Sequence, residues 1–271
     1  MKTLVIINGV TGAIGSACLA RFSREHSVVI YGLSRKADIF SAFVKDGHLP
    51  DCTLICSIGD ILNEDNCSSF IKAIDFSLYK KVIYIHAVGF YPFEFNSIGD
   101  VEVSNDEDGD GIDDRTLNLS YVAFFSMVNS LRKIKQNTSI LIFGGIADKF
   151  KPVVHKSWWM VLEKIKQNIN RHFVSSKNMN FYLLNISSVI CPHEILTRPF
   201  VFQSTNANPR FWLQPCEVAE EVAILTLSNS DKYFIEQDLF HNADYYQKDY
   251  FDNDNFTNRK RAELGIGRVN L

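Results

Sequence analysis

Three glycines near the N-terminus have a spacing suited to binding a phosphate. Residues 8–15 read Asn-Gly-Val-Thr-Gly-Ala-Ile-Gly, after a short apolar run and before an amphipathic helical pattern. We expect Gly9 to form a tight turn, Gly12 or its neighbour to let a ligand approach the backbone, and Gly15 to pack the helix against the strand. A pyrophosphate would then bind the N–H groups at the helix N-terminus. The alternative is a tight turn that binds no ligand.

A second group of polar residues follows the next predicted strand, where residues 32–36 read Gly-Leu-Ser-Arg-Lys. In a dinucleotide-binding fold, an acidic residue at this place accepts hydrogen bonds from the ribose of NAD. Ser34, Arg35 and Lys36 instead offer hydrogen-bond donors and positive charge, which suit the 2′-phosphate of NADP. The residues therefore favour NADP(H), and the alternative is a solvated basic start of a helix.

The elements that position these residues alternate between strands and helices. Continuous apolar runs are typical of strands buried on both faces of a parallel sheet, and they lie at 3–7, 28–33, 53–58, 82–88, 139–143 and 180–186. Helical patterns lie between them, at 14–25, 37–46, 64–77, 115–135 and 157–175. A last helix is expected after Pro215 and a last strand near 233–239.

This alternation predicts an α/β fold, a Rossmann-like doubly wound parallel sheet with right-handed crossovers. We expect a single NAD(P)-binding domain over residues 1–271, with a substrate-side loop at 187–215 and a C-terminal tail at 243–271.

Composition excludes several classes of protein. Hydrophobic residues make up 46% of the chain and charged residues 22%, and the net charge is −3, so disorder and a nucleic-acid partner are not expected. No run approaches the ~20 apolar residues of a membrane span, and the N-terminus lacks the pattern of a signal peptide. The six cysteines include no Cys-x-x-Cys pair. We therefore expect a cytoplasmic protein with no membrane partner.

The glycine segment resembles the Thr-Gly-x-x-x-Gly-x-Gly turn of short-chain dehydrogenases/reductases, with Asn8 for the threonine and Ala13 for the middle glycine. Other landmarks of that family follow in order along nearly the whole chain. Asp60-Ile61 matches the acidic-aliphatic pair that contacts adenine, and residues 86–89, His-Ala-Val-Gly, resemble the Asn-Asn-Ala-Gly segment.

Two further landmarks concern the nicotinamide end of the site. Asn118 matches the helix asparagine of the family's catalytic tetrad, and residues 190–193 with Thr197 resemble its Pro-Gly loop and threonine. The resemblance implies NADP(H) as cofactor and a small-molecule substrate. The implied cofactor contacts are Gly9, Thr11, Gly12, Ile14, Gly15, Ser34, Arg35, Asp60, Ile61, Ala87, Gly89 and Thr197.

The catalytic positions depart from the family. Gly145 stands in place of the substrate-orienting serine, and residues 145–175 contain no Tyr-x-x-x-Lys pair. One register, set by Leu162-Glu163, places His155 at the tyrosine and Trp159 at the lysine. The other register, set by the serine-to-tyrosine spacing, places Trp158 and Leu162 there.

In the family the tyrosine hydroxyl delivers a proton to the carbonyl oxygen, which tryptophan cannot do. Besides Asn118, His155 is our candidate catalytic residue, because imidazole titrates near neutrality. Its alternative role is to begin a helix. We expect the ring of Trp159 to occupy the place where a lysine would reach the nicotinamide ribose.

Eight carboxylates lie between Asp100 and Asp114 with no basic residue among them. Four of them have the spacing of a Ca²⁺-binding loop with a glycine at its bend, although the final glutamate is missing: Asp106, Asp108, Asp110 and Asp114. The alternative is a solvated acidic lid near the mouth of the active site.

Three functions fit these observations. The first is an NADP(H)-dependent oxidoreductase acting on a carbonyl or hydroxyl group with an atypical active site. The second is a catalytically degenerate protein that binds a nucleotide or a partner, and the third is a non-redox isomerase or lyase.

A homodimer or homotetramer is also expected. The family pairs the helices that correspond to 115–135 and 157–175, and both helices carry apolar residues at helical spacing: Val122, Phe125, Val128, Leu131, Val161, Leu162, Ile165 and Ile169.

Overall fold

Seven parallel strands form one sheet. They are β1 (Lys2–Asn8), β2 (Val28–Leu33), β3 (Thr53–Cys56), β4 (Tyr79–His86), β5 (Asn137–Gly145), β6 (Met179–Ile186) and β7 (Phe234–Leu239). The computed structural model describes residues 2–34, 52–56, 61–89, 106–107, 109–190, 212–228, 230 and 232–240. The strand order is β3-β2-β1-β4-β5-β6-β7, so the order reverses between β1 and β4. In open α/β sheets, ligands bind at the carboxyl ends of the strands beside such a reversal.

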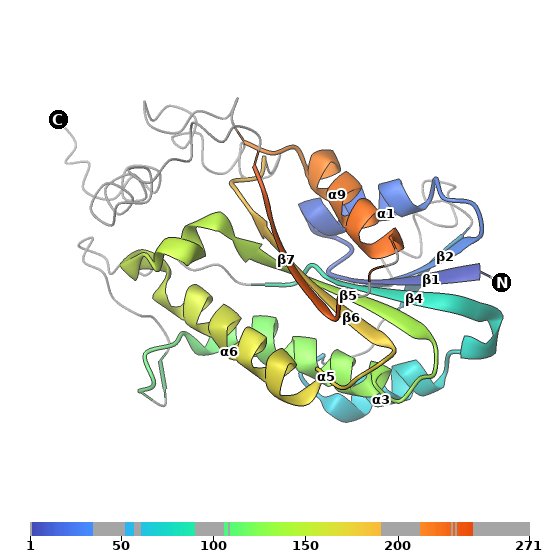
Figure 1. Ribbon diagram of the computed structural model, residues 1–271, viewed down its shortest axis with the longest axis horizontal. Helices are drawn as coiled ribbons and strands as arrows, with labels where there is room; N and C mark the ends of the chain where they lie inside the picture. The colour runs from blue at the N-terminus through green and yellow to red at the C-terminus, as the bar shows by residue number, and fades with distance from the viewer. Residues whose placement is uncertain are drawn as a thin grey trace.

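Helices cover both faces of the sheet (Figure 1). One face carries α1 (Ala13–Phe22) and α9 (Pro215–Leu227), and the other carries α3 (Glu64–Lys72), α5 (Ala123–Leu131) and α6 (Lys156–His172). Successive residues of β1 alternate between the two layers, because side chains in a strand point to opposite faces. Leu4 packs with the α3, α5 and α6 layer, and Val5 packs with the α1 and α9 layer. The expected doubly wound parallel sheet is therefore confirmed.

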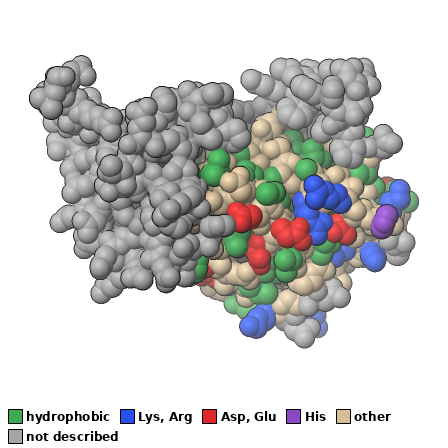
Figure 2. Space-filling view, turned by 90° about the horizontal axis from the view of Figure 1, so that it is seen from above, with side chains coloured by type: hydrophobic (Ala, Val, Ile, Leu, Met, Phe, Trp, Pro, Cys, Tyr) green, Lys and Arg blue, Asp and Glu red, His purple; other side chains and the backbone are tan. Residues whose placement is uncertain are grey.

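The outer face of α1 and α9 is a surface of mixed charge. Figure 2 shows lysine and arginine side chains beside aspartate and glutamate side chains, with hydrophobic side chains between them. Arg21 of α1 pairs with Glu25, one turn further along the helix, and with Glu220 of α9. These pairs join two helices that are far apart in the sequence.

Two predicted helices differ from those observed. The helix expected at 64–77 ends at Lys72, because Asp75 caps a short 3₁₀ turn, η1 (Phe76–Leu78), by accepting a hydrogen bond from the Ser77 N–H at 3.0 Å. The helix expected at 115–135 consists of α4 (Asp114–Thr116), a π-helical turn, η2 (Leu117–Val122), and α5. The helix expected at 37–46 lies outside the described residues.

The apolar residues that suggested a dimer mostly belong to the core of a single chain. Seven of the eight are buried there: Phe125, Val128, Leu131, Val161, Leu162, Ile165 and Ile169. These seven residues therefore do not supply the spare apolar surface that the dimer prediction assumed, because both helices lie against the sheet and against neighbouring elements. Among the described residues, no helix is both long and apolar enough to cross a membrane.

Substituting a buried isoleucine should cost far more stability than substituting an exposed one. Ile165 of α6 is fully buried, whereas Ile224 of α9 is 54% exposed. We expect Ile165→Ala to lower the free energy of unfolding by about 2–5 kcal/mol and Ile224→Ala to change it by less than about 1 kcal/mol. Urea unfolding followed by circular dichroism measures both values, and similar losses for the two variants would contradict the packing described for α6.

Candidate functional site

The glycine turn is held by close backbone contacts. Gly9 has a φ of +83°, and a Cβ atom there would lie 2.5 Å from the carbonyl oxygen of Ala87. A Cβ atom on Gly15 would collide with the carbonyl oxygen of Gly9. Both positions therefore require glycine, as the sequence predicted, and the turn lies directly against the end of β4.

The N-terminus of α1 is open to a ligand. Gly12 precedes the helix in an extended conformation, and within the described residues no side chain caps α1. The Gly12 N–H donates to the carbonyl of Gly9 at 3.0 Å, so it closes the turn. The N–H groups of the first helical residues, Ile14 among them, lack an intrahelical partner and suit an anion. Thr11 and Gly12 are exposed beside them.

The other implied cofactor residues are only partly described. The Ala87 N–H donates to the carbonyl of Asn8 at 2.9 Å, which joins the end of β4 to the glycine turn. Gly89 follows at the same edge, and Ser34 comes directly after β2, which pairs with β1. Ile61 lies in the turn before α3. Arg35, Asp60 and Thr197 lie outside the described residues.

A buried chain of hydrogen bonds runs from β1 to η2. The Asn8 side-chain amide donates to the Tyr84 hydroxyl at 3.4 Å, and that hydroxyl lies 2.8 Å from His86 Nδ1. His86 Nε2 lies 3.0 Å from the carbonyl of Leu119. Because a carbonyl only accepts, Nε2 carries the proton, and Nδ1 accepts the hydrogen bond from Tyr84.

His86 is therefore neutral and structural. Burial lowers the pKa of His86 to about 4, against a smaller effect of its hydrogen bond to Leu119. Its ring also lies edge-on to Phe124, with 5.5 Å between ring centroids. The sequence comparison noted this histidine only as part of residues 86–89 and missed its contact with η2.

Asn118 lies in the π-helical turn η2. The Ala123 N–H donates to the carbonyl of Asn118, five residues earlier, so the helix is widened there. Widened turns of this kind occur frequently at functional sites. The bond from His86 holds the neighbouring Leu119 carbonyl, which fixes the turn relative to β4. The structure thus brings Asn118 to the segment that follows β4.

Trp158, in the first turn of α6, lies against the end of β4. Two ring carbons of this residue are 3.1 and 3.3 Å from the position of a Cβ atom on Gly89, and Ser120 Oγ is 3.6 Å from it. One turn later, a methyl group of Leu162 is 3.1 Å from the position of a Cβ atom on Gly144. Trp158 and Leu162, which one of the two registers places at the tyrosine and lysine positions, therefore lie at the ends of β4 and β5.

Trp159 lies against the segment that precedes α6. Its indole N–H donates to the carbonyl of Pro152 at 3.3 Å, and Lys151 Nζ lies 5.4 Å from the centre of its ring. It faces the segment before α6 because neighbouring helical residues point about 100° apart. His155 precedes α6 and is 1% exposed, so its imidazole belongs to the interior.

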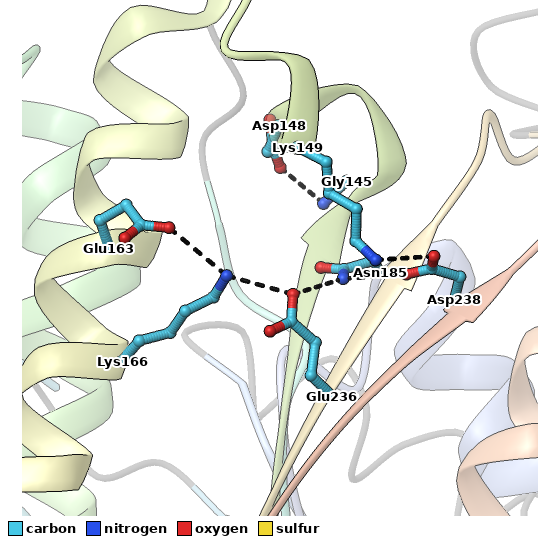
Figure 3. Close-up of polar contacts among 8 residues, drawn as sticks. All are labelled: Gly145, Asp148, Lys149, Glu163, Lys166, Asn185, Glu236 and Asp238. Atoms are coloured by element: carbon cyan, nitrogen blue, oxygen red, sulfur yellow. Dashed lines mark hydrogen bonds and ion pairs between the residues drawn. The ribbon is translucent and has the colours of Figure 1, made fainter. Parts of the chain in front are cut away.

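Asp148 was missed in the sequence and lies at the end of β5 (Figure 3). Its Oδ2 atom accepts a hydrogen bond from the Gly145 N–H at 2.6 Å, and the residue is 8% exposed. Burial raises the pKa of Asp148 to about 8, although Gly145, Trp158 and Lys166 act in the opposite direction. The only signal in the sequence is an acid three residues after a strand that ends in two glycines.

Charged side chains beside Asp148 join α6 to the last two strands (Figure 3). Lys166 of α6 pairs with Glu236 of β7 at 3.1 Å and with Glu163 at 3.4 Å. The Asn185 side-chain amide on β6 donates to Glu236 at 2.9 Å and to Asp238 at 3.1 Å. Lys149, directly after Asp148, pairs with Asp238 at 2.7 Å. These bonds fix the segment that carries Asp148.

The described acidic residues at 106–114 close a loop. Asp106 accepts from the Gly111 N–H, Asp114 accepts from the Glu107 N–H, and Asp110 accepts from the Ile112 N–H, each at 2.9 Å. Asp110 also pairs with Lys164 of α6 at 2.9 Å. Among the described residues, no three His, Cys, Asp or Glu side chains gather to hold a metal. These contacts favour a capped loop over a calcium site, and Asp108 lies outside the described residues.

Comparison with solved structures identifies the fold. A short-chain dehydrogenase/reductase from Brucella melitensis, described as glucose/ribitol dehydrogenase, is similar at a TM-score of 0.64 and 16% identity, over 88% of this chain and 95% of that one. An alcohol dehydrogenase from Thermococcus sibiricus, complexed with 5-hydroxy-NADP, is similar at 0.64 and 13%, over 92% and 99%. The 3-ketoacyl-(acyl-carrier-protein) reductase from Brucella melitensis, complexed with NADH, is similar at 0.64 and 14%, over 88% and 97%.

No protein-family model and no curated protein matches the sequence. At these identities the structural likeness establishes the fold, which is that of the short-chain dehydrogenases/reductases.

The two helix-side glycines of the turn should differ in their tolerance of alanine. A Cβ atom on Gly15 would collide with backbone, whereas one on Gly12 would lie 3.4 Å from the nearest atom, in ordinary contact. We expect Gly15→Ala to lower the free energy of unfolding by about 1–3 kcal/mol or more and Gly12→Ala to change it by less than about 1 kcal/mol. Thermal unfolding compares the two variants, and equal midpoints would contradict the turn geometry.

Asp148 should make the protein less stable as pH rises. Its pKa is raised in the folded state from 3.8 to about 8, so the folded protein keeps a proton that the unfolded chain loses. The stabilisation from this proton is complete below about pH 4 and is lost between about pH 4 and pH 8, by up to about 1.4 kcal/mol per pH unit. Urea unfolding at several pH values should show this slope, and Asp148→Asn should reduce it. Parallel curves for the two proteins would show that Asp148 titrates normally.

Proposed function

We propose that this chain, which has the fold of the short-chain dehydrogenases/reductases, is an NADP(H)-dependent oxidoreductase acting on a carbonyl or hydroxyl group of a small molecule. The observation that carries the proposal is the glycine turn at the β1–β4 reversal. Gly9 and Gly15 admit no side chain, and the open N-terminus of α1 follows them. These features suit a pyrophosphate, and the solved complexes with 5-hydroxy-NADP and NADH support a nicotinamide cofactor for this fold.

Each implied contact has a part in this proposal. The turn residues from Gly9 to Gly15 bind the pyrophosphate, Ser34 and Arg35 bind the 2′-phosphate, and Asp60 with Ile61 borders the adenine. Ala87, Gly89 and Thr197 border the nicotinamide end. When bound, the cofactor supplies or accepts the hydride that changes the oxidation state of the substrate. The chain itself orients the substrate and moves a proton at its oxygen atom.

Asn118 and one acid complete the proposed active site. The widened turn η2 presents Asn118 near the end of β4, and His86 holds that turn in place. His155 is the acid suggested by the sequence. The resemblance also favours a cytoplasmic homodimer or homotetramer, which light scattering at micromolar concentration would test. Buried Cys18 is a free thiol, as a reducing compartment permits.

A second function is favoured by Trp158. Its ring lies against Gly89, and one of the two sequence registers places this residue at the family's tyrosine. An indole N–H does not act as an acid near neutral pH, so a protein with this residue could bind the nucleotide without turning it over. The two functions share the glycine turn and differ only in turnover.

Fluorescence titration of the purified protein with NADPH and NADH tests cofactor binding. Gly12→Ala serves as the matched variant, because it should fold normally while its added methyl group faces the bound pyrophosphate. We expect this variant to bind NADPH at least about tenfold more weakly. No binding of either cofactor to the unmodified protein would overturn the proposed function.

The unmodified protein should prefer NADPH to NADH, because Ser34, Arg35 and Lys36 carry donors and positive charge. We expect Arg35→Ala to remove most of that preference, about 1–3 kcal/mol for a charge-assisted pair, while NADH affinity stays nearly the same. Isothermal titration of both proteins with both cofactors measures the difference. Equal affinities in the unmodified protein would refute the preference for NADP(H).

A further inference from the structure

A reductase of this kind needs a proton donor at the substrate oxygen, and the chain lacks the family's tyrosine. The inference that follows rests on the proposed function. The ring of Trp158 lies against Gly89. The donor must therefore be a different side chain near the ends of β4 and β5, where the hydride would reach the substrate.

Two histidines at this end of the sheet are poorly suited to the role. Both ring nitrogens of His86 are engaged, by Tyr84 and by the carbonyl of Leu119, and burial keeps this imidazole neutral. His155 is 1% exposed and immediately precedes α6. Its backbone N–H donates to the carbonyl of Pro152. Imidazole acts as an acid only when it is protonated, and burial disfavours that charge.

Asp148 has the geometry of a donor. Its Oδ2 atom is fixed by the Gly145 N–H at 2.6 Å, so the carboxyl group lies at the carboxyl end of β5. Oδ1 is buried, and within the part of the chain that the structure describes it has no hydrogen-bond partner. A buried carboxylate oxygen without a hydrogen-bond partner destabilises the folded protein. A protonated carboxyl oxygen that donates a hydrogen bond to a ligand oxygen avoids this cost.

The groups around Asp148 also favour its protonated form. Burial has the largest effect on its pKa, and it outweighs the opposing effects of Gly145 on β5 and of Trp158 and Lys166 on α6. Lys166 is itself paired with Glu163 and Glu236, which reduces its influence on Asp148. Lys149, the next residue in the chain, is paired with Asp238. The carboxyl group therefore holds a proton at neutral pH.

We propose that Asp148 is the catalytic acid, which donates the proton on Oδ1 to the carbonyl oxygen of the substrate during reduction. NADPH is the reductant and supplies the hydrogen and two electrons that form the new C–H bond at the carbonyl carbon. The π electrons of the C=O bond take the proton, so an O–H bond forms as the Oδ1–H bond breaks. The products are an alcohol and NADP⁺, and the Asp148 carboxylate regains its proton from water. In the oxidation of an alcohol, the same carboxylate accepts the proton.

The test compares Asp148→Asn with the unmodified protein. Asparagine has nearly the same shape, and its amide oxygen can still accept the hydrogen bond from the Gly145 N–H, but it has no proton to give. With NADPH and 4-nitrobenzaldehyde or 2,3-butanedione as probes, we expect kcat to fall about 100-fold or more while the Kd for NADPH is unchanged. Asp75→Asn is the matched control, since it makes the same chemical change at an exposed carboxylate that precedes β4, at the opposite end of that strand from the site, and should keep normal turnover.

The pH profile gives an independent readout. The rate of reduction by the unmodified protein should be constant below about pH 8 and fall above it, because the pKa of Asp148 is raised to about 8.

Several outcomes would overturn the assignment. They are normal turnover by Asp148→Asn, a rate of reduction that does not change near pH 8, and NADPH binding by the unmodified protein without reduction of either probe. Failure to bind NADPH or NADH at all is a different result, because it removes the proposed function itself.

Discussion

The contact between the glycine turn and the end of β4 constrains the backbone on which the candidate nucleotide site depends. Gly9 lies so close to Ala87, and Gly15 so close to Gly9, that neither can carry a side chain. The same contact aligns the start of α1 with the reversal of strand order, where both adjacent strands end. The exposed N-terminus of α1 at this point follows from backbone packing, and it does not depend on the side chains that follow β5.

Much of the fold could be predicted because the strands are continuous apolar runs. β2 was predicted with its observed bounds, Val28–Leu33, and β1 differs by one residue at each end. Glycines were informative for a similar reason, since a turn with a positive φ restricts residue type more than any other local feature. The apolar runs and the glycine turn are both encoded by short stretches of sequence, so both could be predicted without the structure.

The active site depends on features that short stretches do not encode. Helical periodicity over 115–135 is the same whether the helix is regular or widened, so η2 could not be foreseen. The two registers for α6 differ by three residues, and the helical pattern alone could not show that Trp158 lies against Gly89. The apolar residues of α5 suggested a subunit interface because periodicity shows a helix face without showing what covers it. Asp148 could be identified as a candidate only from the structure, because its burial depends on residues that are distant in the sequence.

The order of the strands has a consequence for folding kinetics. β1 and β4 lie side by side at the centre of the sheet, yet the hydrogen bond between Asn8 and Tyr84 joins residues 76 positions apart. No neighbouring pair of strands in this parallel sheet can form as a local hairpin, so each pairing requires the closure of a long loop first. Acquisition of the native state should therefore be slow, and the apolar strands are exposed to aggregation until the central pair has formed.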